Sequence, residues 1–224
     1  MTDRIGKHEF SRMMRAAASL IREQQPLLSQ LDCVAGDGDH GTTMLRIMER
    51  LEAEFKEDTA ADLKKCFCDA GWNVMACDGG ASSSLLGAFF LGVGDATQAG
   101  ISSWNCGEFA ATFEIGLLAL QSQTKAQPGD KTMMDALVPA VQALVTEAKT
   151  GNKISDALPA AARAASEGAS ATEKMVARYG RARLVGDKTK GHRDPGAVSV
   201  ALIFQGFAQA MTELKGDATH ARHG

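Results

Sequence analysis

Three aspartates near the start of the chain are spaced so that they could bind a divalent cation. Asp32, Asp37 and Asp39 fall within eight residues and are interleaved with glycines. Glycine tolerates the tight turns and positive φ angles that would bring the carboxylates together. Two such charges about 4 Å apart repel by roughly 4 kcal/mol at an effective dielectric constant of about 20, so a cation between them would stabilise the loop. An all-oxygen ligand set favours Mg²⁺, Mn²⁺ or Ca²⁺.

Other interpretations of this acidic loop are possible. An EF-hand calcium loop needs a glutamate at its twelfth position. Counting from Asp37 places Met48 there, and counting from Asp32 places Thr43 there, which argues against an EF-hand. A solvated turn whose carboxylates cap the next helix stays open, because Asp-Gly pairs are common in turns. The adjacent His40, taken alone, is more often structural than catalytic.

Three further glycine-rich segments, at residues 78–82, 128–132 and 191–196, also carry acidic residues and also precede helical stretches. Helix N-termini offer unpaired N–H groups and a partial positive charge, which suit phosphate. None of the segments is a Walker A motif, and no GxGxxG follows a strand pattern. If the four loops converge in space, they form one site for anions and metal ions.

The elements that must position these loops are helices. Apolar residues recur at steps of three and four, which predicts an all-α fold, and strand-like alternation is absent. The predicted helices span residues 9–24, 44–55, 63–75, 83–91, 109–120, 132–148, 154–179 and 195–214. Asp194 is expected to cap the last helix ahead of Pro195, and Asp130 to start the sixth at Lys131. Residues 1–7 and 216–224 are expected to be loose ends.

Composition limits the function further. The formal charge of −3 and the lack of a long basic run argue against nucleic acid as a partner. The five cysteines have neither zinc-site nor disulfide-framework spacing, so they are expected to be reduced thiols. The start of the chain has no apolar signal region, and no segment reaches the length expected of a membrane span. A soluble, cytoplasmic protein without a membrane partner is therefore expected.

The joint pattern of the four loops carries a resemblance. The segments LDCVAGDGDHGTTM, DGGASSSLLGAFF, PGDKTMMDAL and GRARLVGDKTKGHRDPGAVS occur in that order. Together they resemble the nucleotide-binding L subunit, or the equivalent C-terminal domain, of dihydroxyacetone kinases, over residues 32–208. The resemblance implies one domain over residues 1–224, with a core at about 8–214. It also implies a barrel of eight antiparallel helices with nucleotide and Mg²⁺ at one end.

The resemblance also implies the site residues. Asp32, Asp37 and Asp39 match the carboxylates that bind a pair of Mg²⁺ ions in that family. The residues that match nucleotide contacts are His40, Gly41, Thr42, Thr43, Ala81, Ser82, Thr124, Met133, Arg181, Asp194, Pro195 and Gly196. No catalytic residue beyond this metal and nucleotide site is assigned. The chain departs from the family where Thr43 replaces a common Asn, Ser83-Ser84 a frequent Gly-Pro, and Thr124 a common Gly.

The function implied by the resemblance is phosphoryl transfer to a short ketose. ADP or ATP would bind here, and the ketose, dihydroxyacetone or a tetrulose, would be held by a separate K-type subunit. The phosphate donor is either ATP or a phosphoprotein of the phosphotransferase system. One alternative is a non-catalytic nucleotide-binding regulator that binds a transcription factor, and loss of kinase activity on Asp37→Ala would argue against it. Another is the domain fused in fatty-acid-binding kinase relatives.

Overall fold

The computed structural model describes the backbone of residues 4–56 and 62–220 and the side chains up to residue 214. Eight α-helices and two short strands make up most of these residues. The helices are α1 (Lys7–Asp32), α2 (His40–Glu54), α3 (Leu63–Met75), α4 (Gly80–Ala96), α5 (Cys106–Gln121), α6 (Met134–Lys149), α7 (Ile154–Ala171) and α8 (Pro195–His220). The strands are β1 (Arg4–Gly6) and β2 (Ser103–Asn105).

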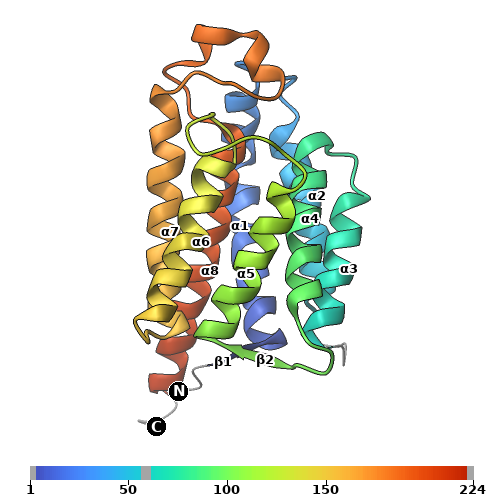
Figure 1. The fold of residues 1–224 in the computed structure, drawn as a ribbon, viewed down its shortest axis with the longest axis vertical. Helices are drawn as coiled ribbons and strands as arrows, with labels where there is room; N and C mark the ends of the chain where they lie inside the picture. Colours follow the sequence, from blue (N-terminus) through green and yellow to red (C-terminus); the bar gives the residue numbers. More distant parts are fainter. Residues whose placement is uncertain (1–3, 57–61, 221–224) are drawn as a thin grey trace.

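The helices run alternately up and down and form a closed ring. Each helix packs against its neighbour in the chain, and α8 returns to pack against α1 (Figure 1). This up-and-down order places the connections after α1, α3, α5 and α7 at one end of the barrel, the upper end in Figure 1. The predicted all-α barrel of eight antiparallel helices is confirmed, and all four glycine-rich loops lie at the same end.

Close helix packing keeps this ring compact on the α3–α5 side. The helix α4 is buried nearly all round, as its continuous apolar sequence predicts. Its Gly87 approaches α3 so closely that an added Cβ would lie 2.9 Å from the Gly71 carbonyl oxygen. On its other side, a Cβ on Gly92 would lie 3.1 Å from the Cα of Gly116 in α5. Side chains larger than hydrogen would push these helices apart.

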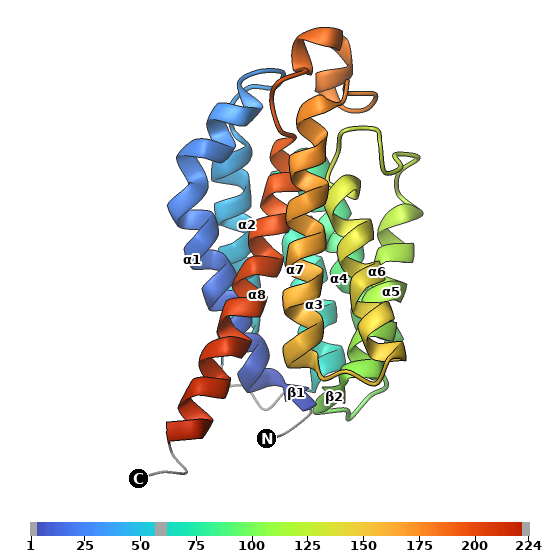
Figure 2. The same ribbon diagram turned by 90° about the vertical axis from the view of Figure 1, so that its left-hand side faces the viewer.

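Large aromatic side chains fill the end of the barrel opposite the four loops. Phe10, Phe55, Phe67, Trp104 and Phe109 are all buried, and their ring centroids lie 4.9–6.4 Å apart where they pair. Several pairs adopt the edge-to-face geometry that aromatic quadrupoles favour. These five aromatic side chains thus pack at the lower end, whereas the connections after α1, α3, α5 and α7 lie at the upper end (Figure 2).

Several predicted boundaries are wrong. The seventh helix ends at Ala171, and three 3₁₀ turns, η1 (Thr172–Lys174), η2 (Arg181–Leu184) and η3 (Gly186–Thr189), follow it in place of a helix to residue 179. The sixth helix begins at Met134, because Lys131 has a φ of 62° that no α-helix accommodates. The first, second and fourth helices are longer than predicted, and α1 continues through Pro26.

The two ends of the chain are more ordered than predicted. Residues 4–6 form β1, which pairs antiparallel with β2, with Ile5 opposite Trp104. The helix α8 continues to His220, so residues 216–220 are helical. Residues 1–3 and 221–224 lie outside the described chain.

The expectation that no segment could span a membrane needs a correction. Within the described residues, Pro195–Leu214 of α8 is long and apolar enough to cross a bilayer by length and composition alone. Most of this stretch is buried inside the protein, where it packs against α1 and α7. A core helix of a helical barrel satisfies the same criteria, so its apolar character is accounted for by packing.

Candidate metal and nucleotide site

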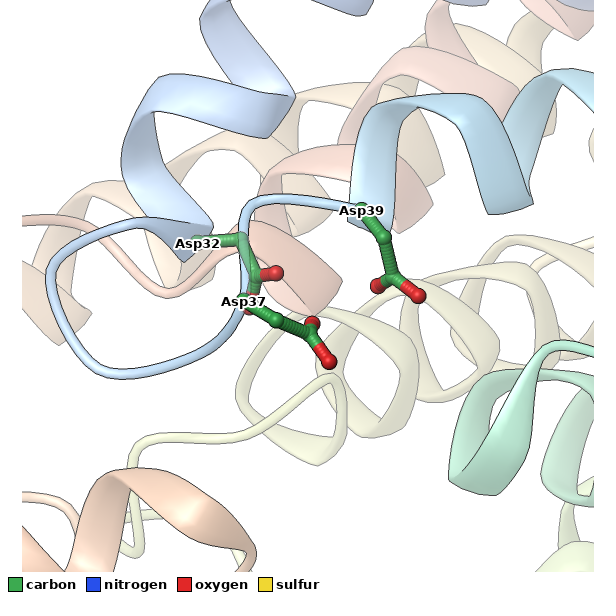
Figure 3. A group of neighbouring side chains, drawn as sticks. All are labelled: Asp32, Asp37 and Asp39. Atoms are coloured by element: carbon green, nitrogen blue, oxygen red, sulfur yellow. The ribbon is translucent and has the colours of Figure 1, made fainter.

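The three predicted metal ligands lie together at the upper end of the barrel. Asp32 is the last residue of α1, Asp37 lies in the following loop, and Asp39 is the residue just before α2. One carboxylate oxygen from each lies within 4.8 Å of the others, and the side chains converge on one region (Figure 3). Asp37 and Asp39 are exposed, whereas Asp32 is half-buried. The group offers three hard oxygen ligands, and open solvent leaves room for phosphates and water, as Mg²⁺ requires.

Glycine at two positions allows the loop to adopt this shape. Gly38 has a φ of +79°, which disfavours any residue with a Cβ, and an added Cβ would lie 2.5 Å from the Cys33 sulfur. Its amide donates a 2.9 Å hydrogen bond to Asp32 Oδ2. A Cβ on Gly36 would overlap the Asp32 carboxylate. The glycines therefore let the backbone fold directly over Asp32 and hold its carboxylate in place.

The negative charge of the triad is only partly compensated by the protein itself. Partial loss of hydration, and then the neighbouring charge of Asp37, raises the pKa of Asp39. The hydrogen bond from Arg181 lowers the pKa of Asp37. Arg181 comes from η2, far along the chain, and pairs with Asp37 across the loop. Positive charge is thus drawn to the triad, and a divalent cation would supply more of it at shorter range.

His40 is a structural link between two helix starts. It begins α2, is buried, and its Nε2 lies 2.7 Å from Ser199 Oγ in α8. Ser199 donates its hydroxyl proton to the Pro195 carbonyl oxygen at 2.9 Å. With that hydroxyl directed at the carbonyl, the hydrogen-bond network assigns Nε2 as the donor to Ser199 and leaves Nδ1 without a proton in the neutral ring. Burial lowers the pKa of His40, in keeping with the neutral form.

The loop between α3 and α4 closes against the start of α2. A Cβ on Gly79 would lie 2.7 Å from Thr43 Cγ2, and Arg46 Nη2 donates to the Asp78 carbonyl oxygen at 2.9 Å. Gly80 has a φ of +56° with open space around it. Of the predicted phosphate contacts here, Ala81 is exposed and Ser82 half-buried in the first turn of α4. These contacts bring the amides of two helix starts to adjacent positions, which suits a phosphate chain.

Ser83, one residue further into α4, has a buried hydroxyl oxygen with no hydrogen-bond partner among the described residues. A buried hydroxyl without a partner is costly, so a hydrogen bond to a water molecule or a ligand oxygen beside it would be stabilising. It lies beside Gly79, where an added Cβ would be 2.1 Å from its Oγ. This orphaned oxygen fits the prediction that an oxygen-rich ligand binds at this loop.

The nucleoside side of the predicted site joins α6 to α8. A Cβ on Gly196 would lie 3.4 Å from the Cβ of Met133, so these two predicted residues are neighbours. Asp194 caps α8 by accepting a 2.7 Å hydrogen bond from the Ala197 amide, as predicted, and Pro195 occupies the first turn. Burial raises the pKa of Asp194 to about 7.

In two of the predicted nucleotide-binding residues, Thr124 and Thr42, the hydroxyl accepts a hydrogen bond from a neighbouring protein group. The Thr124 hydroxyl accepts from the Ala126 amide at 3.1 Å and so turns into its own loop. Thr42 is exposed, and its hydroxyl accepts from Gln25 of α1 at 3.3 Å. Gly41 does lie at the site, pressed so closely on α1 that a Cβ would lie 2.2 Å from the Gln25 carbonyl oxygen.

Sequence reasoning assigned no role to three residues that support the site. Ser199 holds His40, Arg46 holds the α3–α4 loop, and Lys131 ties the α5–α6 loop to residues near α8. Lys131 stands inside a quoted motif, but its role there depends on partners more than 40 residues away in sequence. No local signal identifies such partners.

The fold and this site define a class: an all-helical barrel with an acidic metal-type triad and helix N-termini at one open end. A crystal structure of the dihydroxyacetone kinase of C. freundii in complex with AMP-PNP and Mg²⁺ has this fold, with a TM-score of 0.69 and 25% identity over 89% of the chain. The native form of that kinase matches with a TM-score of 0.70. The chain spans about a third of the length of that kinase.

The chain belongs to the DAK2 domain family, whose model matches residues 34–209. It is 34% identical to the ADP-binding subunit DhaL of the PEP-dependent dihydroxyacetone kinase of Escherichia coli, over 93% of this chain and 99% of that subunit. It is 35% identical to the corresponding subunit of kinase 1 of Listeria innocua, over 84% of this chain and 89% of that subunit. The L-erythrulose 1-kinase of Mycolicibacterium smegmatis is 38% identical over 83% of this chain, which covers 32% of that enzyme. The family predicted from the four loops is confirmed.

Proposed function

We propose that this protein is the nucleotide- and Mg²⁺-binding subunit of a dihydroxyacetone-type kinase, which passes a phosphoryl group to a short ketose held on a separate K-type subunit. The observation that carries the proposal is the convergence of Asp32, Asp37 and Asp39 within 4.8 Å at the end where all four glycine-rich loops meet. The relationship to ADP-binding kinase subunits over nearly their whole length supports it. The whole chain, with its core at about residues 8–214, would act as one domain.

In this proposal the three aspartates hold Mg²⁺, two ions by the family resemblance. When bound, the metal supplies the positive charge that phosphoryl transfer needs on the nucleotide phosphates. The amides of residues 41–43 and 81–82 cradle phosphate oxygens at the two helix starts. Arg181, which reaches the triad through Asp37, is placed to neutralise phosphate charge as well.

The nucleoside would lie between the α5–α6 loop and the start of α8. Met133, Gly196 and Pro195 would border it, with Thr124 at the edge. Asp194 would hold the α8 start in place through its cap. Nothing in this chain is assigned to activate the ketose, so that task falls to the K-type subunit, which would close over the open end of the barrel. A cytoplasmic location follows from this role.

We further propose that ADP stays bound as a cofactor and is recharged by a phosphoprotein of the phosphotransferase system. The support is that the relatives most fully covered by this chain are named as ADP-binding subunits of PEP-dependent kinases. Dihydroxyacetone is the proposed ketose, because it stands in the names of the same relatives. An L-erythrulose 1-kinase is also similar.

The test begins with the purified chain, dialysed against Mg²⁺ and then denatured to release any nucleotide for chromatography. Retained ADP close to one per chain is expected. The protein is next combined with a K-type subunit and dihydroxyacetone, with either ATP or a phosphorylated phosphotransferase-system protein as donor. Phosphorylation of the ketose from the phosphoprotein, but not from ATP, is expected. Turnover with ATP would contradict the proposed phosphate donor. A protein that binds no nucleotide at all would contradict the proposed function.

A further inference from the structure

Lys131 is a buried cation in the loop between α5 and α6, at the end of the barrel that carries the site. The residue is only 5% exposed. Its φ of 62° makes it the one non-glycine residue with a positive φ among those the structure describes. Such a conformation is strained for a side chain with a Cβ and persists only where the surroundings hold it. The contacts of its side chain are therefore expected to hold the loop in this conformation.

The Lys131 ammonium connects its loop to both ends of the α7–α8 connection. Nζ donates a 2.6 Å hydrogen bond to the Thr172 carbonyl oxygen, immediately after α7, and another to the His192 carbonyl oxygen, shortly before α8. Thr172 extends this set of contacts to the residue that caps α8. Its hydroxyl accepts a 2.9 Å hydrogen bond from the Asp194 amide. One ammonium thus joins its own loop to two backbone segments that lie 41 and 61 residues further along the chain.

The backbone on either side of Lys131 is fixed by a second buried charge. Asp135 accepts from the Gly129 amide at 2.5 Å and from the Thr132 amide at 2.8 Å. Burial lowers the pKa of Lys131, while the charges of Asp194 and Asp135 oppose that change. The ammonium therefore has both hydrogen-bond acceptors and counter-charges inside the protein, which is how a buried cation is tolerated.

The loop that Lys131 holds leads directly into the nucleoside side of the proposed site. Met133 lies two residues further on and contacts Gly196, which in turn follows the Asp194 cap. We propose that Lys131 is a positioning residue whose buried ammonium fixes the α5–α6 loop against the start of α8 and so sets the geometry of the nucleotide site. This inference rests on the proposed function, because it assumes that ADP binds between these two segments.

The experiment measures ADP binding by isothermal titration calorimetry at saturating Mg²⁺, together with urea unfolding. Lys131→Met keeps the aliphatic volume and removes the charge, and Lys131→Arg keeps the charge. Lys131→Gly relieves the positive φ and provides a folded variant without an ammonium if Lys131→Met does not fold. Lys188→Met, an exposed lysine in η3, is the matched control.

Lys131→Met and Lys131→Gly are expected to weaken ADP binding by about tenfold or more, because hydrogen bonds from a buried charged group are lost. Lys131→Arg is expected to recover most of the affinity, and Lys188→Met to bind like the unmodified protein. The inference is overturned if the folded Met or Gly variant binds ADP within about twofold of the unmodified protein, or if Lys131→Arg is as weak as Lys131→Met. Failure of the unmodified protein to bind ADP would instead remove the proposed function on which the inference depends.

Discussion

His40 Nε2 lies 2.7 Å from Ser199 Oγ, and this contact links the first residue of α2 to the first turns of α8. The Ser199 hydroxyl lies 2.9 Å from the Pro195 carbonyl oxygen, and donation to that oxygen favours the Nε2–H tautomer of the imidazole. Two loops that flank the proposed phosphate site are thereby held by one buried histidine, and the acceptor nitrogen Nδ1 is kept free of a proton.

In the Ser199→Ala variant, His40 is predicted to lose its preference for the Nε2–H tautomer. In ¹⁵N-detected imidazole spectra, His40 of the unmodified protein is expected to be protonated at Nε2, and the variant to show a mixture of the two tautomers. ADP affinity is expected to fall by about tenfold, the cost of losing one partner of a buried hydrogen bond. Thr212→Ala is the control, since its exposed hydroxyl makes the same bond to a carbonyl four residues earlier in the same helix. An unchanged His40 spectrum would refute the prediction.

Asp39→Asn is predicted to change stability and function in opposite directions. Partial loss of hydration and the nearby carboxylates raise the pKa of Asp39, which means that its negative charge is unfavourable in the metal-free fold. Removing that charge should raise the melting temperature without Mg²⁺ and ADP. In the reconstituted kinase the same change should lower kcat/KM on the order of 100-fold or more, because charge stabilisation at the phosphates is lost. Asp187→Asn, an exposed residue in η3, should change neither quantity, and equal activity of Asp39→Asn would contradict the metal assignment.

Asp194 is predicted to make the stability of the fold depend on pH. Burial raises its pKa to about 7, so between its ordinary pKa of about 4 and pH 7 the folded state binds more protons than the unfolded state. Stability from this group is therefore present at low pH and is lost as pH rises through that window, by at most about 4 kcal/mol. Partial access of solvent reduces this figure.

The measurement for Asp194 is urea unfolding at several pH values between about 4.5 and 8. Asp194→Asn keeps an oxygen that can cap α8 but cannot titrate, so its stability relative to the unmodified protein should increase as pH rises. A constant difference between the two proteins across this range would show that Asp194 ionises normally.

Gly41→Ala is predicted to separate α1 from α2. An added Cβ would lie 2.2 Å from the Gln25 carbonyl oxygen and 2.7 Å from Ser29 Oγ, so the helices must move. The expected loss is about 1–3 kcal/mol in the free energy of unfolding, measured in urea. Gly107→Ala in α5 is the matched control, because its nearest neighbour would be Asn105 Oδ1 at 3.4 Å. Helix propensity should make that variant neutral or more stable by up to about 1 kcal/mol, and equal losses in both would contradict the packing argument.

Most of the fold could be predicted from the sequence, because helical periodicity is a local property. The third helix, 63–75, has the predicted bounds, and the others were located within a few residues or a few turns. The errors arose where distant contacts override local pattern. The pairing of Ile5 with Trp104 makes strands from segments with no strand-like alternation, and the Lys131 contacts hold a backbone that starts no helix.

The sequence alone predicts that Asp32, Asp37 and Asp39 come together, since they share one short loop whose glycines permit tight turns. It also predicts the number of helices and the family to which the chain belongs, which the family model confirms. The remote residues that support the proposed site become apparent only in the folded chain, as with Arg181 at Asp37, Ser199 at His40, and Lys131 at Thr172. The reason is that residues close in sequence are constrained by the backbone between them. Pairs 41 to 159 residues apart meet only when the helices pack side by side in the ring and bring their connections together at one end.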